Sequence, residues 1–254
     1  MSSVPEAPRW YEAWFDRAEY ELVYKSRDQA DARGLFDLID TVTDLKPGDR
    51  VLDMACGRGR HARLFAERGY KVTGVDLSPS AIEAARKMAA DEQLEIEFQT
   101  GDMRDAACDG CFDLVANLFT SFGYFDEDTE NAKAIAAMAR SLVDGGWLVQ
   151  DFMNGVYWSA NLVPFDTSER DGVKVEQRRW IERGRLKKEI TLTKESGEVS
   201  TFIESVRLFT LEDFERMYAD ARLGIVRVFG APDGSPYDRD SRRLIMFSRL
   251  RTEP

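Results

Sequence analysis

The chain has 254 residues, 43% of them hydrophobic, so it is long and apolar enough to bury a globular core. Lys and Arg number 35 against 46 Asp and Glu, and the net charge of −11 argues against a protein that grips nucleic acid phosphates. There is no apolar run of membrane-spanning length, no signal-peptide pattern in residues 1–30, and too few cysteines (three) for a disulfide framework. We therefore expect a cytoplasmic protein without a membrane or nucleic acid partner.

Residues 1–48 have a helical and aromatic pattern. Trp10, Tyr11 and Trp14 recur at helical spacing, and an apolar stripe with helical periodicity follows over residues 35–42. We interpret this segment as a helical lid that precedes the main domain.

Predicted strands and helices alternate from residue 49 to residue 155. This alternation favours a Rossmann-like, doubly wound α/β fold, in which a parallel sheet has helices on both faces. Ser78 and Pro79 mark one helix start as N-cap and first helical residue. The predicted strands cover residues 50–55, 70–76, 94–98, 111–119 and 147–152.

The pattern changes after residue 155. Residues 172–184, 185–198 and 199–209 predict three strands joined by short turns, an antiparallel β meander inserted over residues 156–205. A helix that starts at Thr210 and two closing strands return the chain to the main domain, which thus comprises residues 49–155 and 206–254. An exposed meander could pair with another subunit, so a homodimer is one option.

The segment "DMACGRGRH", residues 53–61, predicts a ligand-binding turn between a strand and a helix. Gly57 and Gly59 allow positive φ and close approach of a ligand to the backbone, and the start of the helix offers unpaired N–H groups. A tight turn without a ligand is the simpler alternative.

A nicotinamide dinucleotide is one candidate ligand. Gly57-x-Gly59-x-x-Ala62 satisfies the relaxed dinucleotide fingerprint, and Asp76 ends the next strand as a ribose-binding acid would. Two acids disfavour this interpretation. Asp53 would repel a pyrophosphate, and Asp102, in "TGDM", adds a second acidic position that suits an adenosine joined to a cationic amino acid.

Residues 51–86, "VLDMACGRGRHARLFAERGYKVTGVDLSPSAIEAAR", resemble the opening motifs of class I S-adenosylmethionine-dependent methyltransferases, and the resemblance covers about residues 30–155. It implies a seven-stranded sheet with the last strand antiparallel. It also implies S-adenosylmethionine as cofactor and S-adenosylhomocysteine as product. The cofactor-binding residues that it implies are Asp53, Ala55, Gly57, Gly59, Asp76, Leu77, Asp102, Met103, Asn117 and Leu118.

The chain is also similar, more loosely, to small-molecule members of this family with an aromatic N-terminal helix and a β meander, such as amino-sugar N-methyltransferases. In those enzymes the N-terminal segment covers the cofactor. The resemblance makes Tyr11, Trp14, Tyr24 and Arg27 lid candidates, and we assign Tyr24 and Arg27 to the cofactor site. Packing in a core is the alternative for each aromatic residue.

Three side chains are candidate catalytic residues. His61 follows the glycine turn, and Asp151 and Asn154 lie at the end of the last predicted parallel strand, where a doubly wound sheet binds its substrate. Packing is the alternative for His61, and a solvated loop for the other two. Cys108 and Cys111 lack the further ligands of a zinc site, so we expect two thiols on a surface loop and no metal.

These observations predict an S-adenosylmethionine-dependent methyltransferase that acts on a small molecule, with a nitrogen acceptor slightly favoured over oxygen. The alternatives are an NAD(P)-dependent oxidoreductase and a non-catalytic module that binds S-adenosylmethionine.

Overall fold

A computed structural model describes residues 9–24 and 29–252 of the chain. Two compact units share these residues. One unit comprises Met1–Arg27 and Leu162–Ser205, and the other, which we call the core unit, comprises Asp28–Asn161 and Val206–Pro254.

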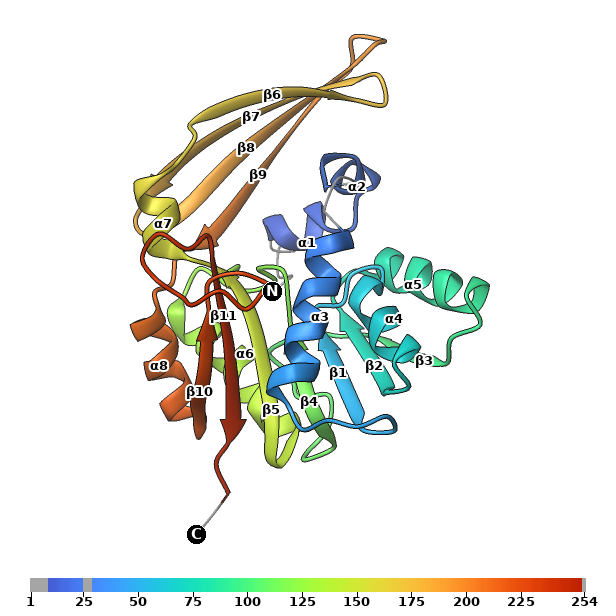
Figure 1. Cartoon of the computed structure of the whole chain (residues 1–254). Coiled ribbons are helices and arrows are strands. Elements are labelled where there is room, and N and C mark those ends of the chain that lie inside the picture. The colour runs from blue at the N-terminus through green and yellow to red at the C-terminus, as the bar shows by residue number, and fades with distance from the viewer. Residues whose placement is uncertain (1–8, 25–28, 253–254) are drawn as a thin grey trace, which may run out of the picture. The chain divides into compact units, whose positions relative to one another are not determined.

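The core unit contains a seven-stranded sheet with the order β10-β11-β5-β4-β1-β2-β3 (Figure 1). Strands β1 to β5 run parallel, whereas β11 is antiparallel to both β5 and β10. The predicted doubly wound sheet with an antiparallel last strand is therefore confirmed. The strands are β1 Arg50–Met54, β2 Lys71–Asp76, β3 Ile96–Thr100, β4 Phe112–Asn117, β5 Leu142–Met153, β10 Leu223–Phe229 and β11 Arg243–Leu250.

Helices cover both faces of this sheet. One face packs against α3 (Gln29–Val42), α4 (Arg60–Glu67) and α5 (Pro79–Asp91) in a single apolar cluster that includes Val51 and Leu114. Successive side chains of a strand point to opposite faces of the sheet, so Leu52 and Val115 face away from Val51 and Leu114. They are equally buried. On that second face α6 (Asp128–Ser141) contacts β4 and β5, and α8 (Leu211–Asp220) contacts α6 and β10. A short helix, α7 (Gly155–Ala160), follows β5.

The N-terminal boundary differs from the predicted lid over residues 1–48. Helix α3 belongs to the core unit, because Leu35, Phe36 and Ile39 are at most 1% exposed within the apolar cluster on the sheet. The apolar stripe over residues 35–42 therefore covers the sheet. The N-terminal part that lies outside the core unit ends at Arg27.

The second unit contains a four-stranded sheet with the order β6-β7-β8-β9, together with two short helices. The three predicted strands are present as β7, β8 and β9, and a fourth strand, β6, which was not predicted, pairs antiparallel with β7. Its sequence, "FDTSER", has a single apolar residue and so lacks the alternation of a half-buried strand. The elements are α1 Trp10–Trp14, α2 Ala18–Tyr24, β6 Phe165–Arg170, β7 Val173–Glu182, β8 Arg185–Lys194 and β9 Val199–Arg207.

Aromatic packing and hydrogen bonds to Glu204 join the helices of this unit to its sheet. Trp14 packs in one apolar cluster with residues of β7 and β8, and its Nε1 donates to Glu204 at 2.7 Å. Glu204 also accepts from the Tyr24 hydroxyl and forms an ion pair with Lys188 at 2.6 Å. The aromatic residues of the N-terminal segment thus pack mainly on the meander.

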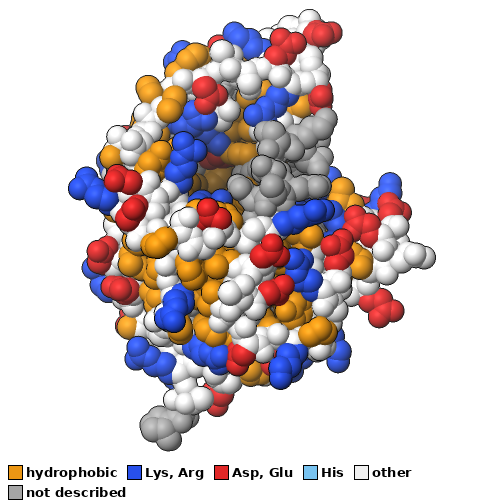
Figure 2. Space-filling model, in the orientation of Figure 1, with side chains coloured by type: hydrophobic (Ala, Val, Ile, Leu, Met, Phe, Trp, Pro, Cys, Tyr) orange, Lys and Arg blue, Asp and Glu red, His pale blue; other side chains and the backbone are white. Residues whose placement is uncertain are grey.

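The surface carries charges of both signs. On the face shown in Figure 2, acidic and basic side chains lie interspersed among apolar ones. Among the described residues, no helix combines the length and the apolarity needed to cross a bilayer.

Candidate functional site

The glycine turn lies at the carboxyl end of β1, between this strand and α4. Gly57 and Gly59 both have positive φ, +54° and +74°, and Ala55 shares this conformation with a φ of 63°. A Cβ on Gly57 would meet no atom within 4 Å, whereas a Cβ on Gly59 would lie 2.8 Å from the Phe98 ring. Gly57 therefore leaves open space above the backbone, and Gly59 lets the helix pack closely on β3.

Asp76, at the end of β2, accepts hydrogen bonds from two loops. One carboxylate oxygen accepts from the Gly57 N–H at 2.8 Å, and the other accepts from the Ser78 N–H at 2.9 Å. Ser78 in turn caps α5 by accepting from the Ala81 N–H. Asp76 therefore lies directly beside the glycine turn.

Asp53 is the only one of the predicted site acids whose buried carboxylate oxygen is left unsatisfied within the described part of the chain. It is 1% exposed, and its Oδ2 has no hydrogen-bond partner there. Burial and, to a lesser degree, the nearby charge of Asp76 raise the pKa of Asp53 to about 7. A buried carboxylate without a full set of donors is suited to a cationic ligand group.

The loop after β3 contains Asp102 and Met103, and Asp102 pairs with Arg104. The Arg104 guanidinium binds the Asp102 carboxylate at 2.5–3.1 Å and also reaches Glu130 at 2.7 Å. The Gly101 N–H donates to the Asp76 carbonyl, so this loop adjoins the end of β2. Met103 is half-buried. Leu77, beside Asp76, is 36% exposed.

Asn117, at the end of β4, is fully buried and takes part in a polar network of the core. Its amide nitrogen donates to the carbonyls of Met54 and Ser121, and its oxygen accepts from Gln150. Gln150 also accepts from the buried Tyr218 hydroxyl at 2.7 Å. Asn117 thus holds the ends of β1 and β4 together, and Leu118 beside it is only 3% exposed.

The three candidate catalytic side chains all have partners within the protein. His61 is 7% exposed, between the rings of Phe36 and Phe119 at centroid distances of 6.1 and 6.0 Å. Asp151 is fully buried and pairs with Arg243. Asn154 caps α7 and also donates to the carbonyls of Asp238 and Ser241.

Tyr24, one of the two lid residues assigned to the cofactor site, belongs to the second unit. Tyr24 donates to Glu204, and its ring lies 4.5 Å from the Lys188 ammonium. Arg27 lies outside the described residues. Both assignments stay predictions.

Comparisons with known proteins show what this chain is similar to. A family model described as a methyltransferase domain matches residues 51–146. A dTDP-3-amino-3,4,6-trideoxy-α-D-glucopyranose N,N-dimethyltransferase of Streptomyces venezuelae is 29% identical over 85% of this chain and 92% of that protein. Residues 51–146 therefore form a methyltransferase domain, and the enzyme uses S-adenosylmethionine.

Solved structures of such methyltransferases share the fold. A methyltransferase from Clostridium acetobutylicum matches with a TM-score of 0.80 and 18% identity, over 92% of this chain and 97% of that one. An amino pentose methyltransferase from Micromonospora echinaspora, solved with S-adenosylmethionine bound, matches over the same shares with a TM-score of 0.69 and 24% identity.

The residues at this edge fit the cofactor. The unsatisfied Asp53 oxygen would suit an ammonium group, Gly57 leaves room over the backbone, and the Asp76 carboxylate would offer acceptors to ribose hydroxyls. When bound, S-adenosylmethionine supplies a methyl group on a sulfonium, which is already activated for transfer.

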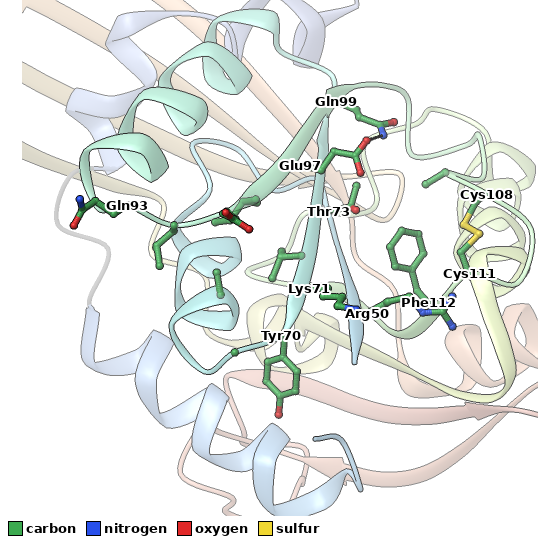
Figure 3. Close-up of a pocket in the computed structure, with 17 residues that line it drawn as sticks. Arg50, Tyr70, Lys71, Thr73, Gln93, Glu97, Gln99, Cys108, Cys111 and Phe112 are labelled. Atoms are coloured by element: carbon green, nitrogen blue, oxygen red, sulfur yellow. Dashed lines mark hydrogen bonds between the residues drawn. A yellow bond between two sulfur atoms is a disulfide. The ribbon is translucent and has the colours of Figure 1, made fainter. Parts of the chain in front are cut away.

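A hollow of about 970 Å³ lies in the core unit (Figure 3). It runs along β2 and β3, and its lining includes Thr73, Glu97 and Gln99. None of the predicted site residues lines it. Cys108 and Cys111 also border it and form a disulfide, so the expectation of two free thiols was wrong. The two residues are three positions apart, which allows this bond locally, and sequence alone does not distinguish the thiol pair from the disulfide.

Two arginines were missed by the sequence reasoning. Arg243 pairs with Asp151 across β11 and β5, 92 positions apart, and no local motif signals that contact. Arg104 could have been found, because it lies only two positions after Asp102.

Proposed function

We propose that the chain transfers the methyl group of S-adenosylmethionine to an amine of a small molecule, in particular the amino group of a nucleotide-linked amino sugar. The observation that carries the acceptor class is the extent of the likeness to sugar N,N-dimethyltransferases, which spans 85% of this chain for two Streptomyces enzymes. The unsatisfied Asp53 carboxylate beside the glycine turn supports the cofactor site.

The proposed chemistry is an in-line displacement, in which the amine lone pair attacks the methyl group. The protein must align the two groups and exclude water, and it needs a base only if the amine reaches the site protonated. Because His61 and Asp151 both have protein partners, we propose that the amine binds in its neutral form. Activity should then rise with pH through the pKa of the amine.

We also propose that Asp76 and Asp102 contact the adenosine part of the cofactor and that the backbone of Gly57 packs against the cofactor. On this view Arg104 must share Asp102 with the ligand. Three further proposals accompany these contacts: a cytoplasmic setting, no nucleic acid target, and pairing of two subunits.

Calorimetric titration tests the cofactor first. S-adenosylhomocysteine and S-adenosylmethionine should bind with micromolar affinity, and NADH should give no signal. Asp76→Ala and Gly57→Leu should abolish binding, whereas Asp113→Asn, which removes a carboxylate that pairs with Arg50 at the other end of the sheet, should not. Binding of NADH alone would favour an oxidoreductase.

Acceptor identity requires a second assay. The enzyme is incubated with S-adenosylmethionine and a panel of dTDP-amino sugars, free amino sugars and matched hydroxy sugars, and products are identified by mass. Methylation of amines but not of the hydroxy analogues would support the proposal. Tight cofactor binding without turnover on the whole panel would favour a non-catalytic binding module.

A further inference from the structure

The backbone after β4 is strained at two successive residues. Phe119 and Thr120 both have a φ of +63°, in the left-handed region that side chains with a Cβ rarely adopt. For Thr120, which is β-branched, this conformation is a clear outlier. Such strain persists only where the surroundings hold it, and it concentrates at ligand sites. This turn lies at the carboxyl edge of the sheet, where the cofactor turn also lies.

Asp151, on the neighbouring strand β5, holds the strained backbone. Its Oδ2 accepts from the Phe119 N–H at 3.0 Å, and its backbone carbonyl accepts from the Thr120 N–H at 2.8 Å. The Thr120 carbonyl accepts from the Tyr124 hydroxyl at 2.9 Å. Since Asp151 is fully buried, these bonds are shielded from water, and the positive φ angles direct both amides to one residue.

Arg243, the first residue of β11, completes this arrangement. Its Nε donates to the Asp151 Oδ1 at 2.8 Å, and a terminal nitrogen binds Oδ2, so the pair is bidentate. The same guanidinium lies 4.9 Å from the centroid of the Phe119 ring. Arg243 therefore neutralises the buried carboxylate and also packs on the side chain of the strained residue.

The Phe119 ring connects this pair to the cofactor turn. The guanidinium of Arg60 lies 4.5 Å from the ring centroid. Arg60 is the first residue of α4, directly after Gly59. Packed contacts thus run from β11 through Asp151 and Phe119 to the glycine turn.

We propose that Asp151 and Arg243 act as a positioning pair that holds the Phe119–Thr120 turn and, through the Phe119 ring, the start of α4 in the geometry that binds the cofactor. In this role Asp151 touches no reacting atom and is not a general base. The inference rests on the cofactor contacts of the proposed function and is independent of the acceptor.

The test uses Arg243→Leu, with S-adenosylhomocysteine as the calorimetric probe and hydrogen exchange measured on peptides that contain residues 118–124. We expect exchange there to accelerate about tenfold or more, and S-adenosylhomocysteine to bind about 5- to 20-fold more weakly. Because this variant leaves the Asp151 charge buried without its cationic partner, which disfavours folding, the double variant Asp151→Asn/Arg243→Leu is measured in parallel. Arg243→Lys keeps the positive charge but cannot form the bidentate pair with Asp151. It should recover part of the affinity for S-adenosylhomocysteine.

Arg249→Leu is the matched control. Arg249 lies on the same strand, pairs with Asp44 at 2.7 Å and lies 4.2 Å from the Trp147 ring, at the opposite end of the sheet. Its loss should lower the melting temperature but leave exchange at residues 118–124 and the affinity for S-adenosylhomocysteine within about twofold of wild type.

Two results would overturn the proposal. If exchange at residues 118–124 does not change in the Arg243 variants, the pair does not hold the turn. If exchange accelerates but S-adenosylhomocysteine binds as in wild type, the pair is structural only. Neither result depends on finding a methyl acceptor, so failure here is distinct from failure to methylate amines.

Discussion

Asp53→Asn should stabilise the ligand-free protein at alkaline pH and weaken its binding of S-adenosylhomocysteine. Burial, assisted by the charge of Asp76, raises the pKa of Asp53 from its ordinary 3.8 to about 7. Above pH 7 the folded protein must therefore hold an ionised carboxylate that is 1% exposed and has one oxygen unsatisfied within the described residues. The amide removes that charge and also the partner proposed for the ammonium group of the ligand.

The sign and size of the effect follow from proton linkage. Between pH 3.8 and 7 the folded protein binds more protons at Asp53 than the unfolded chain does, so its stability falls as the pH rises through this window. At about 1.4 kcal/mol for each pKa unit, the cost is about 2 kcal/mol at pH 5 and about 4 kcal/mol at pH 8. The advantage of Asp53→Asn over wild type should grow by about 2–3 kcal/mol across that range, or roughly 5–10 °C in melting temperature.

Urea unfolding of wild type and variant at pH 5 and pH 8 measures this difference directly. Asp113→Asn, in which the lost carboxylate is 29% exposed, serves as the control and should show no such growth. A stability difference for Asp53→Asn that is the same at both pH values would refute the reasoning about burial. Unchanged affinity for S-adenosylhomocysteine would refute the ligand contact.

Four other substitutions test three separate parts of the structure. Gly59→Ala should cost more unfolding free energy than Gly57→Ala, about 3 against about 1 kcal/mol, because only its Cβ would meet the Phe98 ring; chemical denaturation compares them. Glu204→Gln should destabilise the meander unit by about 3 kcal/mol, because Lys188, 13% exposed, loses its charged partner; hydrogen exchange of β8 reports it. Tyr218→Phe should cost about 1–3 kcal/mol and lower the urea midpoint, because the Gln150 oxygen loses its buried donor.

Local spacing in the sequence predicted much of the core unit and the position of the glycine turn. The glycines before α4 and the Ser78–Pro79 start of α5 are found where predicted, because turns and helix caps depend on residues only a few positions apart. The alternation of strands and helices likewise predicted the parallel sheet, since it follows from the periods of the two elements.

Only the tertiary structure decided which side chains are free to meet a ligand. Asp151 and Asn154 follow the expected strand, yet partners 84 to 92 positions away engage both. Whether α3 covers the core sheet or belongs to a lid was likewise open in the sequence, because an apolar stripe shows that a helix face is buried but not against what. Strand order and register bring distant residues together, and they depend on the packing of the whole chain, which no local pattern records.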